Sequence, residues 1–227
     1  MIQAISATQI LDLIQKGQTA AIREAAAKDP AVLKLRAEDG STLIRQAVYR
    51  QNPEIARLLI ELGAKPNFYD ACALGDWPLA NRFLTDDKAN AAALARSFSE
   101  DGFSPLGLAV FFSHRDLAIR LLALGASAAE PSHNALKVTP LHSATAAADL
   151  VMVAILLSHG ADPNAREFLG ATPLHSAAAE GNLDAVKLLI LHGASASLRT
   201  NAGETPLDLA HKYHRNDVAE WLAHPIP

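Results

Sequence analysis

Cysteine, aromatic residues and long apolar runs are all scarce in this chain of 227 residues. Cys72 is the one cysteine, so no disulfide can form within the chain, and such usage is typical of a reducing compartment. Aromatic residues make up 5% of a chain that is 50% hydrophobic, so the core must consist mainly of small and aliphatic side chains. No run reaches the roughly 18 apolar residues that a membrane-spanning helix needs.

A surplus of positive charge is also missing. The net charge is −4 at pH 7, whereas proteins that bind nucleic acid or anionic membranes usually carry a basic surface, so we expect neither as the main partner. The first residues do not form a basic segment followed by a long apolar stretch, which is the pattern of a secretory signal. Together with the cysteine usage, this predicts a cytoplasmic protein.

A short motif recurs along the chain with a period of 33 residues. Its three clear copies are Thr139-Pro140-Leu141-His142, Thr172-Pro173-Leu174-His175 and Thr205-Pro206-Leu207-Asp208. Weaker copies are Ser104-Pro105-Leu106-Gly107 and Ser41-Thr42-Leu43-Ile44. A fixed period of this length predicts a stack of similar structural units, each stabilised by its neighbours, rather than a globular enzyme with one deep core.

Each unit is predicted to contain two helices and a long loop. The threonine of the motif is suited to cap a helix, and the proline is suited to the first helical position. In residues 172–204, Gly181 ends this first helix by adopting a left-handed conformation. Apolar residues then recur at helical spacing over 183–192, and Gly193 ends the second helix.

The ends of the second helices complete the pattern, with LLSHGAD at 156–162 and LLILHGAS at 188–195. With these motifs the chain resembles ankyrin repeat proteins. The resemblance implies an all-α solenoid of stacked helix-turn-helix units, connected by loops or hairpins, as a single domain over 1–227. The expected units, with the first and last as caps, are 6–36, 37–66, 67–100, 101–133, 134–166, 167–199 and 200–227.

Three segments depart from the regular pattern. The third unit lacks the Thr-Pro block, and the loop before it is shortened. Residues 85–103 are rich in alanine, which predicts a longer second helix or an extra turn. Residues 128–138 exceed the period, and this insertion is either a binding feature or neutral drift in a tolerant loop.

Histidine and cysteine are the candidates for chemistry. The resemblance implies that His142 and His175 make structural hydrogen bonds within and between units. His211 and His214 lie three residues apart without an evident third ligand, whereas a zinc site needs about four ligands, or three and water. Cys72 lies among small helical residues, so we interpret it as a packing residue. We therefore predict no catalysis, no metal and no cofactor.

A partner is expected on the concave face and at the loop tips, again by resemblance. The exposed positions are the seventh and eighth residues after the threonine position of each motif, and several of them hold aromatic residues or arginine, which are common at binding hot spots. Phenylalanines are also predicted at loop tips. The predicted partner-binding residues are Tyr49, Arg50, Phe98, Phe103, Phe111, Phe112, Phe168 and Tyr213. The alternative for Phe111 and Phe112 is that one of them turns inward and fills space beside the irregular third unit.

The sequence thus predicts a non-catalytic module that binds a protein partner, and we expect a monomer. Three alternatives stay open. The aromatic residues could form a homodimer seam in a self-associating scaffold. The chain could be an engineered repeat protein without a natural partner, although its irregular spacing argues against this. It could also be an enzyme or a metal-binding protein.

Overall fold

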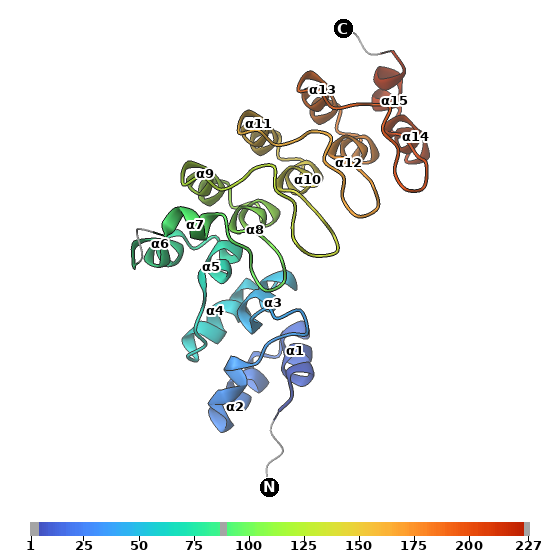
Figure 1. The fold of residues 1–227 in the computed structure, drawn as a ribbon. Helices are drawn as coiled ribbons and strands as arrows, with labels where there is room; N and C mark the ends of the chain where they lie inside the picture. The colour runs from blue at the N-terminus through green and yellow to red at the C-terminus, as the bar shows by residue number, and fades with distance from the viewer. Residues whose placement is uncertain (1–4, 87–89, 225–227) are drawn as a thin grey trace. The chain divides into compact units, whose positions relative to one another are not determined.

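The computed structural model describes residues 5–86 and 90–224. Residues 1–4, on which the signal-sequence expectation partly rests, and Ala89 of the alanine-rich segment lie outside this part. The described residues form fifteen α-helices and one 3-10 helix, and their only extended pairing is an isolated bridge between Arg36 and Thr42 (Figure 1). The predicted all-α class is confirmed. In the same described part, no helix combines the length and apolar character needed to cross a membrane.

The chain up to Leu108 forms one compact unit. Its helices are α1 (Ala7–Gln15), α2 (Thr19–Lys28), η1 (Pro30–Lys34), α3 (Leu43–Tyr49), α4 (Pro53–Glu61), α5 (Phe68–Leu74), α6 (Trp77–Asp86), α7 (Ala91–Ala95) and the first part of α8 (Pro105–Phe111). Successive helices pair as α1 with α2, α3 with α4 and α5 with α6, and α3 also contacts α1 and α5. The short helix α7, which packs on α6, is the extra turn predicted within residues 85–103.

The chain from Ala109 forms a second compact unit. It contains the end of α8, followed by α9 (Arg115–Ala123), α10 (Pro140–Ala146), α11 (Leu150–Ser158), α12 (Pro173–Glu180), α13 (Leu183–Leu191), α14 (Pro206–Lys212) and α15 (Asn216–Ala223). Helices α10, α12 and α14 contact one another in sequence, and α11, α13 and α15 form a second row (Figure 1). The long loops that precede α10, α12 and α14 extend beyond the first row.

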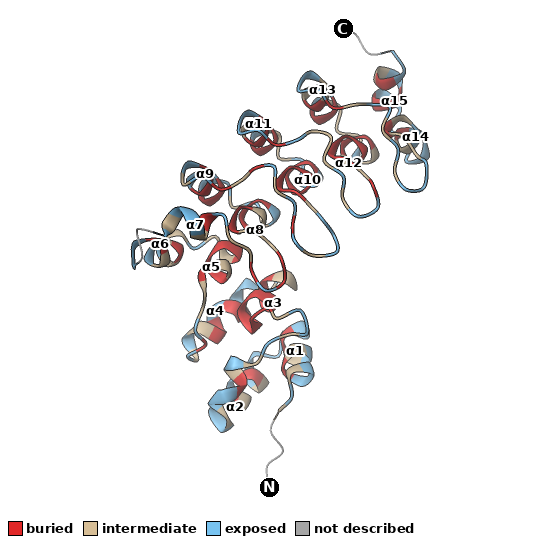
Figure 2. Cartoon of the chain, in the orientation of Figure 1, coloured by how far each residue is buried: buried red, intermediate tan, exposed pale blue. Residues whose placement is uncertain are grey.

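Small and aliphatic side chains fill the space between the helices. In α12, Leu174, Ala177 and Ala178 are fully buried, and in α13, which contacts α12, Val186 and Leu189 are fully buried. Both helices carry buried segments in Figure 2. Residues three and four positions apart share one face of a helix, so this spacing turns one apolar stripe toward the neighbouring helices. Alanine lets the helices approach closely, which explains why so few aromatic residues are needed.

The helix starts follow capping chemistry. Thr139 and Thr205 each accept a hydrogen bond from the backbone N–H three residues later. Thr42 does the same for α3, so the weak copy of the motif at 41–44 caps its helix through the threonine from which the exposed positions Tyr49 and Arg50 are counted. In the third repeat, residues 67–100, Asn67 replaces the missing Thr-Pro block and forms a capping box with Asp70.

Candidate functional site

Four of the predicted binding residues, named below, lie in the first of the two compact units, which ends at Leu108. All four are half-buried there. The Tyr49 hydroxyl donates to Asp101 over 2.5 Å, and its ring packs edge-on against Phe103 with centroids 6.3 Å apart. Arg50 donates to the backbone carbonyl and the side chain of Gln46. The carbonyl of Phe98 accepts a hydrogen bond from a neighbouring tyrosine hydroxyl. These contacts give the four residues structural roles, and partner binding through them stays a prediction.

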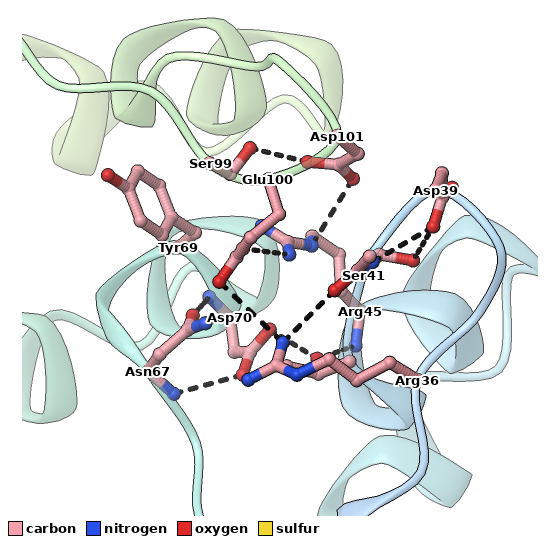
Figure 3. A network of polar contacts seen from close by, with 12 residues as sticks. Arg36, Asp39, Ser41, Arg45, Asn67, Tyr69, Asp70, Ser99, Glu100 and Asp101 are labelled. Carbon is pink, nitrogen blue, oxygen red and sulfur yellow. Dashed lines mark hydrogen bonds and ion pairs between the residues drawn. The ribbon is translucent and has the colours of Figure 1, made fainter.

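Asp101, which accepts the Tyr49 hydrogen bond, belongs to a polar network centred on Arg45 (Figure 3). The Arg45 side chain is 0% exposed; its Nη2 donates to Glu100 over 3.1 Å, and its Nε lies 3.3 Å from the buried carboxylate of Asp101. The guanidinium carbon also lies 5.8 Å from the centre of the Tyr69 ring. Burial, and secondly the hydrogen bond to Asp101, raise the pKa of the Tyr49 hydroxyl. A buried cation is therefore compensated by two carboxylates from residues 100 and 101.

A second buried carboxylate connects α3 to α5. The Thr42 hydroxyl donates to Asp70 Oδ1 over 2.6 Å, and the backbone N–H of Asn67 donates to Asp70 Oδ2 over 2.9 Å. Burial raises the pKa of Asp70, while these two hydrogen bonds and the Arg45 charge oppose that shift. Because Asp70 is fully buried and satisfied by its own unit, we interpret it as a structural residue.

Arg45 occupies the position that histidine holds in the regular motif. Counted from the caps Thr42, Thr139 and Thr172, the third helical residue is Arg45, His142 and His175, respectively. His142 Nε2 lies 3.2 Å from the carbonyl of Ala171, and His175 Nε2 lies 3.1 Å from the carbonyl of Glu204. Each of these two histidines therefore joins its own helix to the loop that leads into the following repeat.

Both histidines also bond within their own units. The Nδ1 atom lies 2.8 Å from the hydroxyl of the capping threonine in both blocks, and the backbone N–H of that threonine also points to it. Nδ1 accepts this N–H, so the hydrogen-bond network assigns the proton to Nε2, which donates to the carbonyl of the next loop. Burial lowers the pKa of both rings, which favours the neutral form that this geometry requires.

In the second unit, Phe111 and Phe112 lie at the end of α8 and form an edge-to-face pair with centroids 5.0 Å apart. Phe111 is 57% exposed, while Phe112 is half-buried and its ring lies 6.4 Å from that of His114. Phe111 therefore does not fill space in the interior. Tyr213, at the end of α14, is also exposed, and the Lys212 ammonium lies 5.7 Å from the centre of its ring.

The loops of the second unit carry an exposed apolar group that sequence reasoning found only in part. Phe168 was predicted, and the structure adds Leu136 and Leu169; these three residues, 45–55% exposed, are called the loop-tip patch. The Phe168 N–H donates to the carbonyl of Leu136 over 3.0 Å, which joins two successive loops. Asn201 of the next loop donates to the carbonyls of Phe168 and Leu169. The sequence signal was the adjacent pair Phe168-Leu169 within a polar loop.

The candidates for chemistry do not assemble into a reactive site. Among the described residues, no group of three or more histidine, cysteine, aspartate or glutamate side chains could hold a metal ion. His211 and His214 are both exposed. Cys72 is fully buried, and burial raises the pKa of its thiol, which disfavours the reactive thiolate. In the described structure, Cys72, His211 and His214 therefore form neither a metal site nor an activated thiol.

Comparison with protein families agrees with the repeat geometry. A model described as ankyrin repeats in three copies matches residues 141–226, and a single ankyrin repeat model matches residues 39–71. The two matches cover 86 and 33 residues, together 119 of 227. The chain belongs to the ankyrin repeat family. Repeats of this family generally act as protein–protein interaction modules and are typically non-catalytic. No curated protein matches the chain.

Proposed function

We propose that this chain is a non-catalytic module that binds a protein partner through its second unit. The proposed contact residues are the loop-tip patch together with Phe111, Phe112 and Tyr213 at the ends of α8 and α14. The loop-tip patch carries the proposal, because three large apolar side chains on adjacent loops are 45–55% exposed to water. Grouped apolar exposure of this kind is typical of binding surfaces.

The loops are also preorganised for binding. Backbone hydrogen bonds join residue 168 to residue 136 and residue 201 to residue 169, so the three loop tips are held together before a partner arrives. A surface that is already ordered loses less conformational entropy on association, and its aromatic side chains can then serve as anchors. The proposal includes a monomeric, cytoplasmic protein that binds neither nucleic acid nor membranes, supported by the net charge of −4.

Affinity capture from a cell lysate with matched variants as baits tests this function. The wild-type chain, a patch variant (Leu136→Ser, Phe168→Ser, Leu169→Ser) and a control variant (Val151→Ser, Leu191→Ser) are used as baits. The control removes exposed apolar side chains from α11 and α13, where Val151 and Leu191 are 53% and 81% exposed. We expect a protein that the wild type and the control retain and that the patch variant loses.

Two outcomes would count against the proposal. Equal retention by all three baits would remove the patch as the contact surface. Loss from the control as well as the patch variant would indicate non-specific apolar adhesion. Circular dichroism of each bait must first show an unchanged helical signal.

A further inference from the structure

The first unit contains a second candidate surface, on the side of the shortened connection between α4 and α5. It is a pocket of about 270 Å³ formed by η1, the start of α3 and the residues that follow α4. Three cationic residues line it, Lys34, Arg36 and Lys65, and no carboxylate does. Its other side chains include Leu33 and Leu35. The pocket therefore combines positive charge with an aliphatic wall.

The three cations differ in how far their charge is already compensated. Arg36 Nη1 lies 3.7 Å from a carboxylate oxygen of Glu100 and donates to the carbonyl of Gly40. Lys34 and Lys65 form no ion pair with any described residue. Two uncompensated cations that line one concave site attract an anionic group, and because both lysines are exposed, solvent ions screen this attraction.

We propose that this pocket binds an acidic segment of a partner protein, with a carboxylate side chain between Lys34 and Lys65 and an aliphatic side chain against the leucines. The volume is below that of a drug-sized site, which is about 300–1,000 Å³, and suits one or two side chains. The proposal takes only the class of partner from the proposed function, because the surface and its residues are different.

The neighbouring surface explains why a peptide fits better than a polyanion. Arg36 also lines a second, more open hollow, and Asp12, Glu38 and Asp39 line that hollow with it. A nucleic acid backbone presents phosphates along its whole length and needs an extended basic track. In this second hollow the three carboxylates outnumber the two cations, Arg36 and Arg50, so a short acidic segment is matched and a longer polyanion is disfavoured.

Fluorescence anisotropy with the full chain tests this site. The probe is a labelled peptide in which glutamates alternate with leucines between terminal glycines. One control peptide replaces each glutamate by lysine, and another replaces each leucine by serine. We expect saturable binding of the acidic leucine peptide alone, and weaker binding as salt is raised. Lys34→Ala and Lys65→Ala should each weaken the affinity about two- to five-fold, as expected for single exposed charge pairs.

A matched variant controls for net charge. Lys16→Ala with Lys28→Ala removes two exposed lysines of the same unit that pair with Asp12 and Glu24, away from the pocket lining. This double variant should bind the peptide like the wild type, whereas Lys34→Ala with Lys65→Ala should not. The patch variant of the second unit should also bind like the wild type, so failure of this proposal and failure of the proposed function are separable.

Several results would overturn the proposal. These are no binding of the acidic leucine peptide, equal binding of the lysine peptide, and equal weakening by the control double variant. Displacement of the peptide by inorganic phosphate at similar concentrations would show a site for free anions. Tighter binding of a duplex DNA oligonucleotide would assign the pocket to nucleic acid instead.

Discussion

His142 and His175 use both ring nitrogens, and this fixes their charge state. Nδ1 accepts from the backbone N–H of the capping threonine, and Nε2 donates to a carbonyl of the next loop. A proton added to Nδ1 would face an N–H that already points toward it. Burial disfavours the charged ring further, and the pKa of both histidines lies below the ordinary 6.5.

This geometry predicts that acid weakens the fold through these two rings. Since their folded pKa is lowered, the unfolded state binds more protons below about pH 6.5, and the free energy of unfolding falls as the pH drops through that range. The double variant His142→Ala, His175→Ala should be less stable near neutral pH but lose less further stability on acidification. Urea unfolding of both proteins between about pH 7 and about pH 5 measures the difference.

Asp70 changes the free energy of unfolding in the opposite direction. Its pKa is raised in the folded state, so protonation of its carboxyl at acidic pH favours folding. Asp70 is present in both proteins, so the difference between their pH profiles isolates the two histidines. Parallel profiles would contradict the assignment.

The two carboxylates that pair with Arg45 differ in how far they are exposed to water. Asp101 is 3% exposed and Glu100 is 49% exposed at the side chain, while Arg45 itself is fully buried. Asp101→Asn should cost about 3 kcal/mol, because it leaves a buried guanidinium without its buried counter-charge. Glu100→Gln should cost less than about 1 kcal/mol, since water screens the exposed pair. Chemical denaturation measures both, and equal losses would show that burial does not separate the two roles.

Residues 96–104 connect α7 to α8 and act as part of the support for α3. In the second unit, His142 and His175 reach the loop of the next unit, about 29 residues further along the chain. Arg45 reaches Glu100, 55 residues away, because only six residues separate α4 from α5 and no long loop lies between them. The close approach is visible at Gly40, where an added Cβ would lie 2.9 Å from Glu100 Cβ. We infer that this segment replaces the missing loop.

Replacing residues 97–103 by a glycine-serine linker of equal length tests that role. The amides of α3 and α5 should then exchange with solvent about 100-fold faster, since the linker removes the buried partner of Arg45 together with the Tyr49 and Tyr69 contacts. Hydrogen exchange read by mass spectrometry measures this, with α12 as an internal reference. Unchanged protection of α3 would show that the segment is dispensable.

For the molecule as a whole, we predict a monomer of 24.1 kDa. The net charge of −4 opposes self-association, because two copies of the chain repel each other. Sedimentation equilibrium from low to high micromolar concentration checks the mass. A mass that rises with concentration, and falls back in the variant Phe111→Ala, would support the homodimer alternative.

Much of the fold was predictable because its determinants are local. Thr139 and Thr205 mark helix starts because a cap needs only the next three residues, and the buried stripe of α12 and α13 follows from helical spacing. The start of α5 was missed, since Asn67 and Asp70 form the same capping box with other residue types. The candidate site was less predictable, because position within a repeat does not reveal exposure.

The sequence by itself determined the period, the helix pairs and the family, since these depend on contacts between residues a few positions apart. Only the tertiary structure decided that Tyr49 bonds to Asp101, 52 residues away, whereas Phe111 is left in water. It also brought Leu136 beside Phe168 and gathered Lys34, Arg36 and Lys65 around one pocket. Such long-range contacts depend on the lengths of the loops and on how far side chains extend across repeats. A local sequence pattern does not determine either.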